Sequence, residues 1–525
     1  MKKLPCSIFN DVIGPVMRGP SSSHVAGGAR IADIVRQSFQ APLKKVICEF
    51  DPTGALAASH TGHGTDMGFA CGLMGMDLSN PEVDRYELLI KEKGIDIEYR
   101  IVEYGAVHPG NYRIRAAAED GTEQSWEGIS VGGGMIEMQR FDGFCVKICG
   151  DFYELLVVAD FSEISADDLK NQVREILPAY EFCLEDRVDG RGLINWKLAV
   201  PVEPSLREAV NAISGVTNFV YLEPILPTRS SANCDVPYQS AERLMAYAKE
   251  HHMEAWQYAV LYESIRGGVS GQEVLNQMES ILSVMERAVD SGLAGTDYEN
   301  RILGPQAYKI DEKDAEGALV PCNPLNSIIK SITAVMEAKS SMGLIVAAPT
   351  VGSCGCLPGT IIGLGREMGL SREKMVQGLM VAGLIGIFIA EEATFSAEVA
   401  GCQVECGAAS GMAAAAVAQM MGGTVGQCVN AASMALQNIT GLACDPVANR
   451  VEIPCLGKNV MGGMNAVASA NMILAGYDAV IPLDETIAAI YEIGLSLPLE
   501  LRCTCGGLGK TRTSMEMLGN HERHT

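Results

Sequence analysis

Positive charge is scarce in this 525-residue sequence, where 40 lysines and arginines stand against 64 aspartates and glutamates. The formal net charge is therefore −24. Nucleic acids and anionic membrane surfaces attract proteins through basic patches that displace counterions. This charge balance argues against nucleic-acid and membrane-surface partners.

The sequence also shows no secretory signal and no convincing membrane span. Two lysines open it, but a proline and an aspartate follow before an apolar core develops. The uncharged stretch 344–365 contains two prolines and five glycines, and the stretch 375–390 is short for a bilayer and meets Glu391 and Glu392. Both stretches predict buried helices and their connecting loop, and we expect a cytoplasmic protein.

Close cysteine pairs of the CxxC type are absent, although the sequence contains 17 cysteines. A reducing cytoplasm keeps thiols free, so a disulfide framework is not expected. Most of these cysteines are then small buried hydrophobic residues. Only cysteines in special surroundings need a further explanation.

The sequence pattern predicts a multi-domain protein, with an N-terminal α/β (α+β) domain followed by an all-α C-terminal domain. We expect the first domain over residues 1–150 and a small α+β unit, a possible regulatory insertion, over 151–205, with a helix beginning at Ser165. An irregular linker is expected over 206–237 and an all-helical domain over 238–525. Strand-like runs in the first half occupy 44–50, 86–92, 96–105, 144–149 and 153–159.

Cys402, Cys444 and Cys455 are the candidate metal ligands. Their separations of 42 and 11 positions match no zinc-finger or ferredoxin spacing. Each of them, however, lies beside glycine or proline, where free backbone N–H groups can stabilise a thiolate. Three thiolates on a [4Fe–4S] cluster leave one iron open to substrate, and an open iron is a Lewis acid.

The N-terminal half contains the candidate acid–base and substrate-binding residues. Three serines and a histidine in GPSSSHVAGGARI (19–31) run into a predicted helix, where they could hold a carboxylate or simply cap the helix. The segment SHTGHGTDMG (59–68) offers His60 and His63 as bases and Asp66 as an orienting carboxylate. HPGN (108–111) adds a histidine at a turn.

Taken together, the ordered motifs resemble the iron–sulfur-dependent L-serine dehydratases (L-serine ammonia-lyases), in a single-chain form with fused beta and alpha domains. The resemblance covers nearly the whole chain. It rests on GPSSSHVAGGARI, GHGTD, HPGN and SVGGG in the first half, and on AAPTVGSCGCLPG, AEVAGCQVECG, QNITGLACDPV, VEIPC and KN in the second.

The resemblance implies an oxygen-sensitive [4Fe–4S] cluster held by Cys402, Cys444 and Cys455, and no pyridoxal phosphate. It implies that His63 removes the α-proton of L-serine, which loses water to give pyruvate and ammonia in amino-acid degradation and gluconeogenesis. The residues expected to bind the substrate are Ser21, Ser22, Ser23, His24, His108 and Asn111. The roles of the remaining cysteines near these motifs stay open, namely Cys354, Cys356, Cys406, Cys503 and Cys505.

Two departures from the family pattern lie where a substrate would be recognised. Val25 follows SSSH where relatives usually have threonine, and HPGN replaces the more usual HPN. L-Threonine and L-cysteine, the latter as in a desulfidase, are therefore alternative substrates, and an iron–sulfur sensor is a non-enzymatic alternative. We expect a homodimer from the large apolar, alanine-rich domain.

Overall fold

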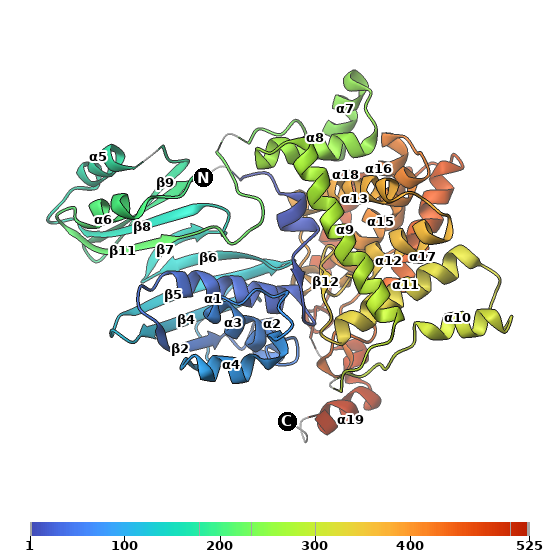
Figure 1. Cartoon of the computed structure of the whole chain (residues 1–525), viewed down its shortest axis with the longest axis horizontal. Coiled ribbons are helices and arrows are strands. Elements are labelled where there is room, and N and C mark those ends of the chain that lie inside the picture. The colour runs from blue at the N-terminus through green and yellow to red at the C-terminus, as the bar shows by residue number, and fades with distance from the viewer. Residues whose placement is uncertain (1–2, 178, 233, 300, 505, 522–525) are drawn as a thin grey trace.

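The protein divides into a sheet-rich half and a helical half that lie side by side (Figure 1). The computed structural model describes residues 3–177, 179–232, 234–299, 301–504 and 506–521. The expected fold class is confirmed, because both sheets of more than two strands belong to the first half and long helices fill the second.

A six-stranded sheet organises the N-terminal part. Its strands stand in the order β3-β2-β4-β5-β6-β7, and only the β2–β3 pair is parallel. Helices α1 (Gly27–Gln37) and α3 (Thr65–Met74) share its apolar core. The strands are β2 (Leu43–Phe50), β3 (Asp96–Ile101), β4 (Asn111–Ala118), β5 (Glu123–Gly132), β6 (Met135–Phe141) and β7 (Phe144–Ile148).

Residues 86–92, expected as a strand, instead form helix α4 (Tyr86–Glu92). The run YELLIKE does not alternate apolar and polar residues, and Ile90 is its buried side chain while Leu88 is exposed. One buried position per helical turn suits a surface helix better than a strand. The helix follows a short 3₁₀ turn, η3 (Val83–Arg85).

A second, four-stranded antiparallel sheet follows in the chain. Its order is β11-β8-β10-β9, and the elements alternate as βαββαβ, which is a ferredoxin-like unit. Ser165 caps its first helix by accepting a hydrogen bond from the N–H of Asp168 at 3.1 Å, as expected. The elements are β8 (Tyr153–Asp160), α5 (Ala166–Ile176), β9 (Phe182–Val188), β10 (Arg191–Leu198), α6 (Pro204–Asn211) and β11 (Val216–Leu222).

The expected linker 206–237 is wrong in its first part, because α6 and β11 occupy much of 204–222 and complete the ferredoxin-like unit. Pro204 stands in the first turn of α6, where a proline is tolerated. Strand β11 lies at the edge of the sheet and pairs with β8, which is a middle strand. Its short sequence VTNFVYL becomes recognisable as a strand only when β8 is there to pair with it.

The helical half is built around α15 (Cys406–Met420), which is buried along its whole length. Glycines bring neighbouring helices close: a Cβ on Gly359 or Gly363 of α12 (Cys356–Glu367) would lie within 3 Å of α11 (Asn323–Ser340). The other helices are α7 (Ala241–His251), α8 (Ala255–Gly267), α9 (Gly271–Leu293), α10 (Tyr308–Ala315), α13 (Arg372–Glu392), α14 (Ala397–Ala400), α16 (Val425–Gln437), α17 (Cys455–Leu474), α18 (Leu483–Ser496) and α19 (Arg512–His521).

Within the described part of the chain, one helix, α13, is long and apolar enough to cross a membrane, but 78% of its most apolar window is buried inside the protein. It contacts α8, α9 and α15. These contacts make α13 a core helix of the helical half, as the sequence predicted for residues 375–390.

The N-terminal segment joins the two halves. Its first turn, η1 (Ile8–Val12), packs against α13, and strand β1 (Val16–Met17) pairs with β12 (Ile345–Val346) of the helical half. The chain enters the six-stranded sheet only after this pairing. The expected N-terminal domain of residues 1–150 therefore begins with a segment that packs in the helical half.

We expect Gly72→Ala to lower the free energy of unfolding by about 1–3 kcal/mol, because overpacking forces the backbone to shift. The new Cβ would lie 2.1 Å from the carbonyl oxygen of Ala29, where α3 crosses α1. Chemical denaturation measures the change. Gly426→Ala in α16 is the matched control, since its Cβ meets only Met245 at 3.5 Å, and a similar loss there would contradict the steric explanation.

Candidate functional site

The three serines of the SSSH segment have different partners, and the capping explanation does not hold for Ser21. Ser21 precedes the irregular turn η2 (Ser22–Ala26) without a capping bond, and its Oγ lies 2.9 Å from Nδ1 of His24. Ser22 Oγ accepts a hydrogen bond from the N–H of Val351 at 3.2 Å. Ser23 Oγ donates to Oε1 of Glu398 at 2.9 Å. Two of the three serines thus bond to the helical half.

His24 and His63 stack edge to face, with ring centroids 4.6 Å apart. His24 uses both nitrogens, because its Nε2 lies 2.8 Å from Ser59 Oγ. His63 is 1% exposed, and neither ring nitrogen has a hydrogen-bond partner among the described residues. Burial lowers the pKa of each histidine to about 3. Both rings are therefore neutral near pH 7, and the nitrogens of His63 remain available to a ligand.

Asp66, expected to orient His63, bonds to His60 instead. Its Oδ1 lies 2.7 Å from Nδ1 of His60, and its Oδ2 accepts from the hydroxyl of Thr61. Asp66 stands in the first turn of α3, whereas His63 precedes that helix. The change of direction at Gly64, which has a φ of 81°, separates the two side chains.

The polar groups of the HPGN turn form hydrogen bonds within and beside the turn. Asn111 is buried, and its amide supports the turn: Oδ1 accepts from the N–H of Asp51 at 3.0 Å, and Nδ2 donates to the carbonyl of His108 at 2.9 Å. The amide nitrogen carries a second N–H, which none of these bonds uses. His108 accepts from the N–H of Gly110 at 3.1 Å, and burial lowers its pKa, which Glu398 partly offsets.

Glu398 of α14 is a site residue that the sequence analysis missed. It is buried, and its carboxylate accepts hydrogen bonds from Ser23 and, at 2.8 Å, from Ser396. It also lies 3.8 Å from Nδ1 of His24. Its place four residues before Cys402, inside the quoted segment AEVAGCQVECG, was the available signal.

Cysteines gather on the helical side of the same boundary. Cys402, Cys406 and Cys444 form one buried cluster with Leu442 and Cys503 packed against it. The hydrogen bond with Cys406 and the charge of Lys458 lower the pKa of Cys402 to about 7 despite its burial. A thiol with such a pKa is partly thiolate near neutral pH.

Cys455 begins α17, where unpaired backbone N–H groups favour a thiolate. Burial raises its pKa to about 12, and the nearby Cys402 adds to this rise. For Cys444, the hydrogen bond with Cys503, followed by burial, raises the pKa. Protons on these thiols would be released when a metal binds, because metal ligands are thiolates.

Lys458 and Asn459, quoted above only as the motif KN, hold the cysteine loops together. Lys458 Nζ donates to the carbonyl of Ala443 at 2.6 Å and to Oδ1 of Asp445 at 2.8 Å. The buried side chain of Asn459 donates to the carbonyl of Cys455 at 2.8 Å and accepts from the N–H of Cys356 at 2.8 Å. Lys458 and Asn459 can make these contacts only because the tertiary structure brings three loops close together.

The C-terminal segment folds back onto the Cys444 loop. The N–H of Cys444 donates to the carbonyl of Leu501 at 2.8 Å, and the N–H of Cys503 donates to the carbonyl of Cys444 at 2.9 Å. Cys505 lies outside the described residues. Cys354 and Cys356 are buried outside the cysteine cluster, and burial raises the pKa of both.

The histidines and the cysteine loops face the same boundary. A Cβ on Gly62 would lie 2.8 Å from Nδ2 of Asn449, so the GHGTD loop packs against the loop between Cys444 and Cys455. The charges of Glu398, Arg450 and Lys339 act on His63. Among the described residues, no three His, Cys, Asp or Glu side chains are grouped to hold a single metal ion.

The fold and this site define an enzyme in which a β-rich domain supplies neutral histidines and a helical domain supplies a carboxylate and clustered cysteines. Comparison with known families agrees with this division. The family model "Serine dehydratase alpha chain" matches residues 239–508, and "Serine dehydratase beta chain" matches residues 9–94. The chain belongs to the serine dehydratase family, with the beta-chain part preceding the alpha-chain part in one polypeptide.

Individual relatives match the same two parts of the chain. The chain is 38% identical over 286 residues to the probable L-serine dehydratase alpha chain of Bacillus subtilis (strain 168), which covers 53% of this chain and 94% of the relative. It is 40% identical over 152 residues to the probable beta chain of that organism, covering 29% of this chain and 67% of the relative. L-serine dehydratase 1 of Escherichia coli (strain K12) is 24% identical over 504 residues, covering 93% of this chain and 95% of the relative.

We expect the stability of the protein to fall as the pH drops below the ordinary histidine value of 6.5. The folded-state pKa of His24 and of His63 is about 3, so the unfolded chain binds more protons between these pH values. Each histidine then costs up to about 1.4 kcal/mol per pH unit.

Denaturation midpoints between about pH 7 and pH 5 measure this dependence, which His63→Gln should make shallower. His251→Gln, which changes an exposed histidine, is the control and should keep the wild-type dependence. If His63→Gln keeps the wild-type pH dependence of stability, His63 binds its proton as readily in the folded protein as in the unfolded chain.

Proposed function

We propose that this enzyme dehydrates L-serine to pyruvate and ammonia, using a [4Fe–4S] cluster held by Cys402, Cys444 and Cys455. The observation that supports this best is His63, a neutral buried base whose two nitrogens have no partner among the described residues. It lies at the boundary that the cysteine loops also face. Family membership supports serine as the substrate.

The donor set fits an iron–sulfur cluster better than a hard cation. Thiolates are the usual ligands of such clusters, and the three proposed ligands come from separate loops in a buried region. Lys458 and the N-terminus of α17 supply positive potential that stabilises thiolates. The bound cluster would supply a Lewis-acidic iron that polarises the bond between the β-carbon and the hydroxyl of serine.

The side chains of this chain would bind and deprotonate the substrate. His63 would take the α-proton, a function open to it because burial keeps its ring neutral. Ser21, Ser23 and His24 would orient the carboxylate, and Glu398 would accept a hydrogen bond from the ammonium group. Loss of the proton and of the hydroxyl leaves aminoacrylate, which tautomerises to an imine and hydrolyses to pyruvate and ammonia.

The remaining expectations belong to the same proposal. A cluster with an exposed iron makes the enzyme sensitive to oxygen, and its reaction suits amino-acid degradation and gluconeogenesis in the cytoplasm. Pyridoxal phosphate would have no function in this mechanism. We further propose a homodimer, with L-serine as the small-molecule partner.

Cys402→Ala, Cys444→Ala and Cys455→Ala should each abolish cluster binding and pyruvate formation. Anaerobically purified wild type should contain about four irons and four sulfides per chain and lose its activity in air. Cys428→Ala is the matched control, since Cys428 is buried in α16 and no other cysteine affects its pKa.

Cys406→Ala tests the ligand assignment more sharply, because Cys406 packs directly against Cys402. We expect it to keep its iron, because Cys406 is not one of the three proposed ligands. Iron loss in Cys406→Ala combined with iron retention in Cys455→Ala would overturn the ligand set. An iron-loaded wild type that converts L-threonine or L-cysteine but not L-serine would overturn the substrate assignment.

His63→Gln should lower kcat by about 10²–10⁴-fold at unchanged iron content, because it removes the proposed base. Asp66→Asn should lower kcat by less than about tenfold, because Asp66 bonds to His60 and does not touch His63. Steady-state pyruvate formation measures both variants. Wild-type kcat in His63→Gln would assign the base to another residue.

A further inference from the structure

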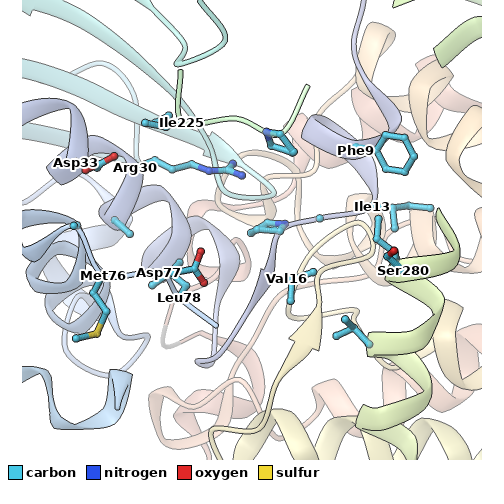
Figure 2. Close-up of a pocket in the computed structure, with 18 of the residues that line it drawn as sticks. Phe9, Ile13, Val16, Arg30, Asp33, Met76, Asp77, Leu78, Ile225 and Ser280 are labelled. Atoms are coloured by element: carbon cyan, nitrogen blue, oxygen red, sulfur yellow. The ribbon is translucent and has the colours of Figure 1, made fainter. Parts of the chain in front are cut away.

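A separate pocket of about 590 Å³ lies between the sheet-rich half and helix α9. Its walls come from the N-terminal segment, from α1 and the turn after α3, from the connection after β11, and from α9. Figure 2 shows Phe9, Ile13 and Ser280 on one side and Arg30, Asp77 and Ile225 on the other. The lining includes none of the residues of the candidate active site.

Arg30 is the unusual member of this pocket. It is 9% exposed, yet its only described hydrogen bonds run from Nη1, to the carbonyl of Gly134 at 2.6 Å and to the sulfur of Met135 at 3.6 Å. Burial lowers its pKa to about 10, and the charge of Asp11 partly offsets this fall. The carboxylate of Asp11 accepts a hydrogen bond from the N–H of Ser7.

A buried guanidinium is costly unless an anion pairs with it. Among the described residues, no carboxylate forms an ion pair with Arg30, whereas the neighbouring Arg36 is paired with Asp33 at 2.6 Å. Figure 2 shows the guanidinium of Arg30 extending into the pocket. The structure therefore leaves N–H donors of a largely buried cation without a protein partner among the described residues, facing an open pocket.

The rest of the pocket selects the kind of anion. Phe9, Ile13, Ile281 and Val284 make the wall opposite Arg30 apolar. An apolar wall cannot solvate the additional negative charge of a phosphate or a dicarboxylate, so the pocket favours a ligand with a single carboxylate. Asp77 stands exposed at the rim and points towards the same space, where it could meet an ammonium group.

We propose that this pocket binds a small aliphatic carboxylate, with the carboxylate on Arg30 and the hydrocarbon chain against Ile281 and Val284. The ligand would contact both halves of the protein at once. It would therefore stabilise their association and raise the melting temperature of the whole chain. The source is either an aliphatic amino acid, whose ammonium Asp77 would meet, or the corresponding 2-oxo acid.

The test uses the full-length protein and three probes with the same branched chain, namely L-valine, 2-oxoisovalerate and L-valinamide. Isothermal titration gives affinities, and thermal unfolding gives the shift in Tm. We expect both carboxylates to bind and raise Tm at millimolar concentration, and L-valinamide to bind about tenfold or more weakly. If L-valine binds more tightly than 2-oxoisovalerate, and Asp77→Asn removes this difference in affinity, the site is assigned to an amino acid. If the two bind equally tightly, the carboxylate alone is recognised.

Two variants locate the binding. Arg30→Gln should weaken the binding of L-valine and of 2-oxoisovalerate by about tenfold or more. Ser280 lies on α9, on the wall opposite Arg30, and Ser280→Leu should fill the pocket without changing Arg30. This variant therefore tests the site even if Arg30→Gln does not fold. Arg366→Gln is the control, because Arg366 pairs with Asp290 and does not line this pocket.

Three results would overturn the proposal. One is that neither carboxylate binds the wild-type protein at millimolar concentration. Another is that L-valinamide binds as tightly as L-valine. The third is that Ser280→Leu binds the carboxylates with wild-type affinity, which would place them elsewhere on the protein.

Discussion

The N-terminal segment is packed into the helical half before the chain enters the β-rich domain, and the site depends on this constraint. Glu263 accepts hydrogen bonds from the hydroxyl of Ser7 and the N–H of Ile8. Gly383 and Gly386 of α13 make room for Ile8 and Val12, since a Cβ at either glycine would lie within 2.6 Å of them. Four residues after β1, the chain reaches Ser21. The serines and histidines of the first half are thereby held against the helical half.

The surroundings of the boundary keep the two histidines neutral and favour ionisation of one thiol, that of Cys402. Burial keeps His24 and His63 uncharged, and the carboxylate of Glu398 accepts hydrogen bonds from the hydroxyls of Ser23 and Ser396. Lys458 lies on the cysteine side and favours the thiolate of Cys402. The proposed proton abstraction and the proposed metal ligation would thus have separate electrostatic surroundings within one site.

Local signals in the sequence were sufficient for several features and misleading for others. The cap at Ser165 and the apolar run of α13 follow from short-range pattern, and both are found. The strand expected at 86–92 is a helix, because burial at that surface selects one position per turn. The expected linker is too long because it includes β11, whose partner strand β8 lies more than 50 residues away in the sequence.

The sequence alone determined the division into a mixed and a helical half, the motifs that resemble serine dehydratases, and the set of residues able to do chemistry. Tertiary structure alone decided which of those residues meet. It joined Asp66 to His60, committed the amide of Asn111 to its own turn, and brought Glu398, Lys458 and Asn459 to the site. The physical reason is that hydrogen bonds and desolvation depend on distances in space, whereas sequence patterns report only the neighbours along the chain.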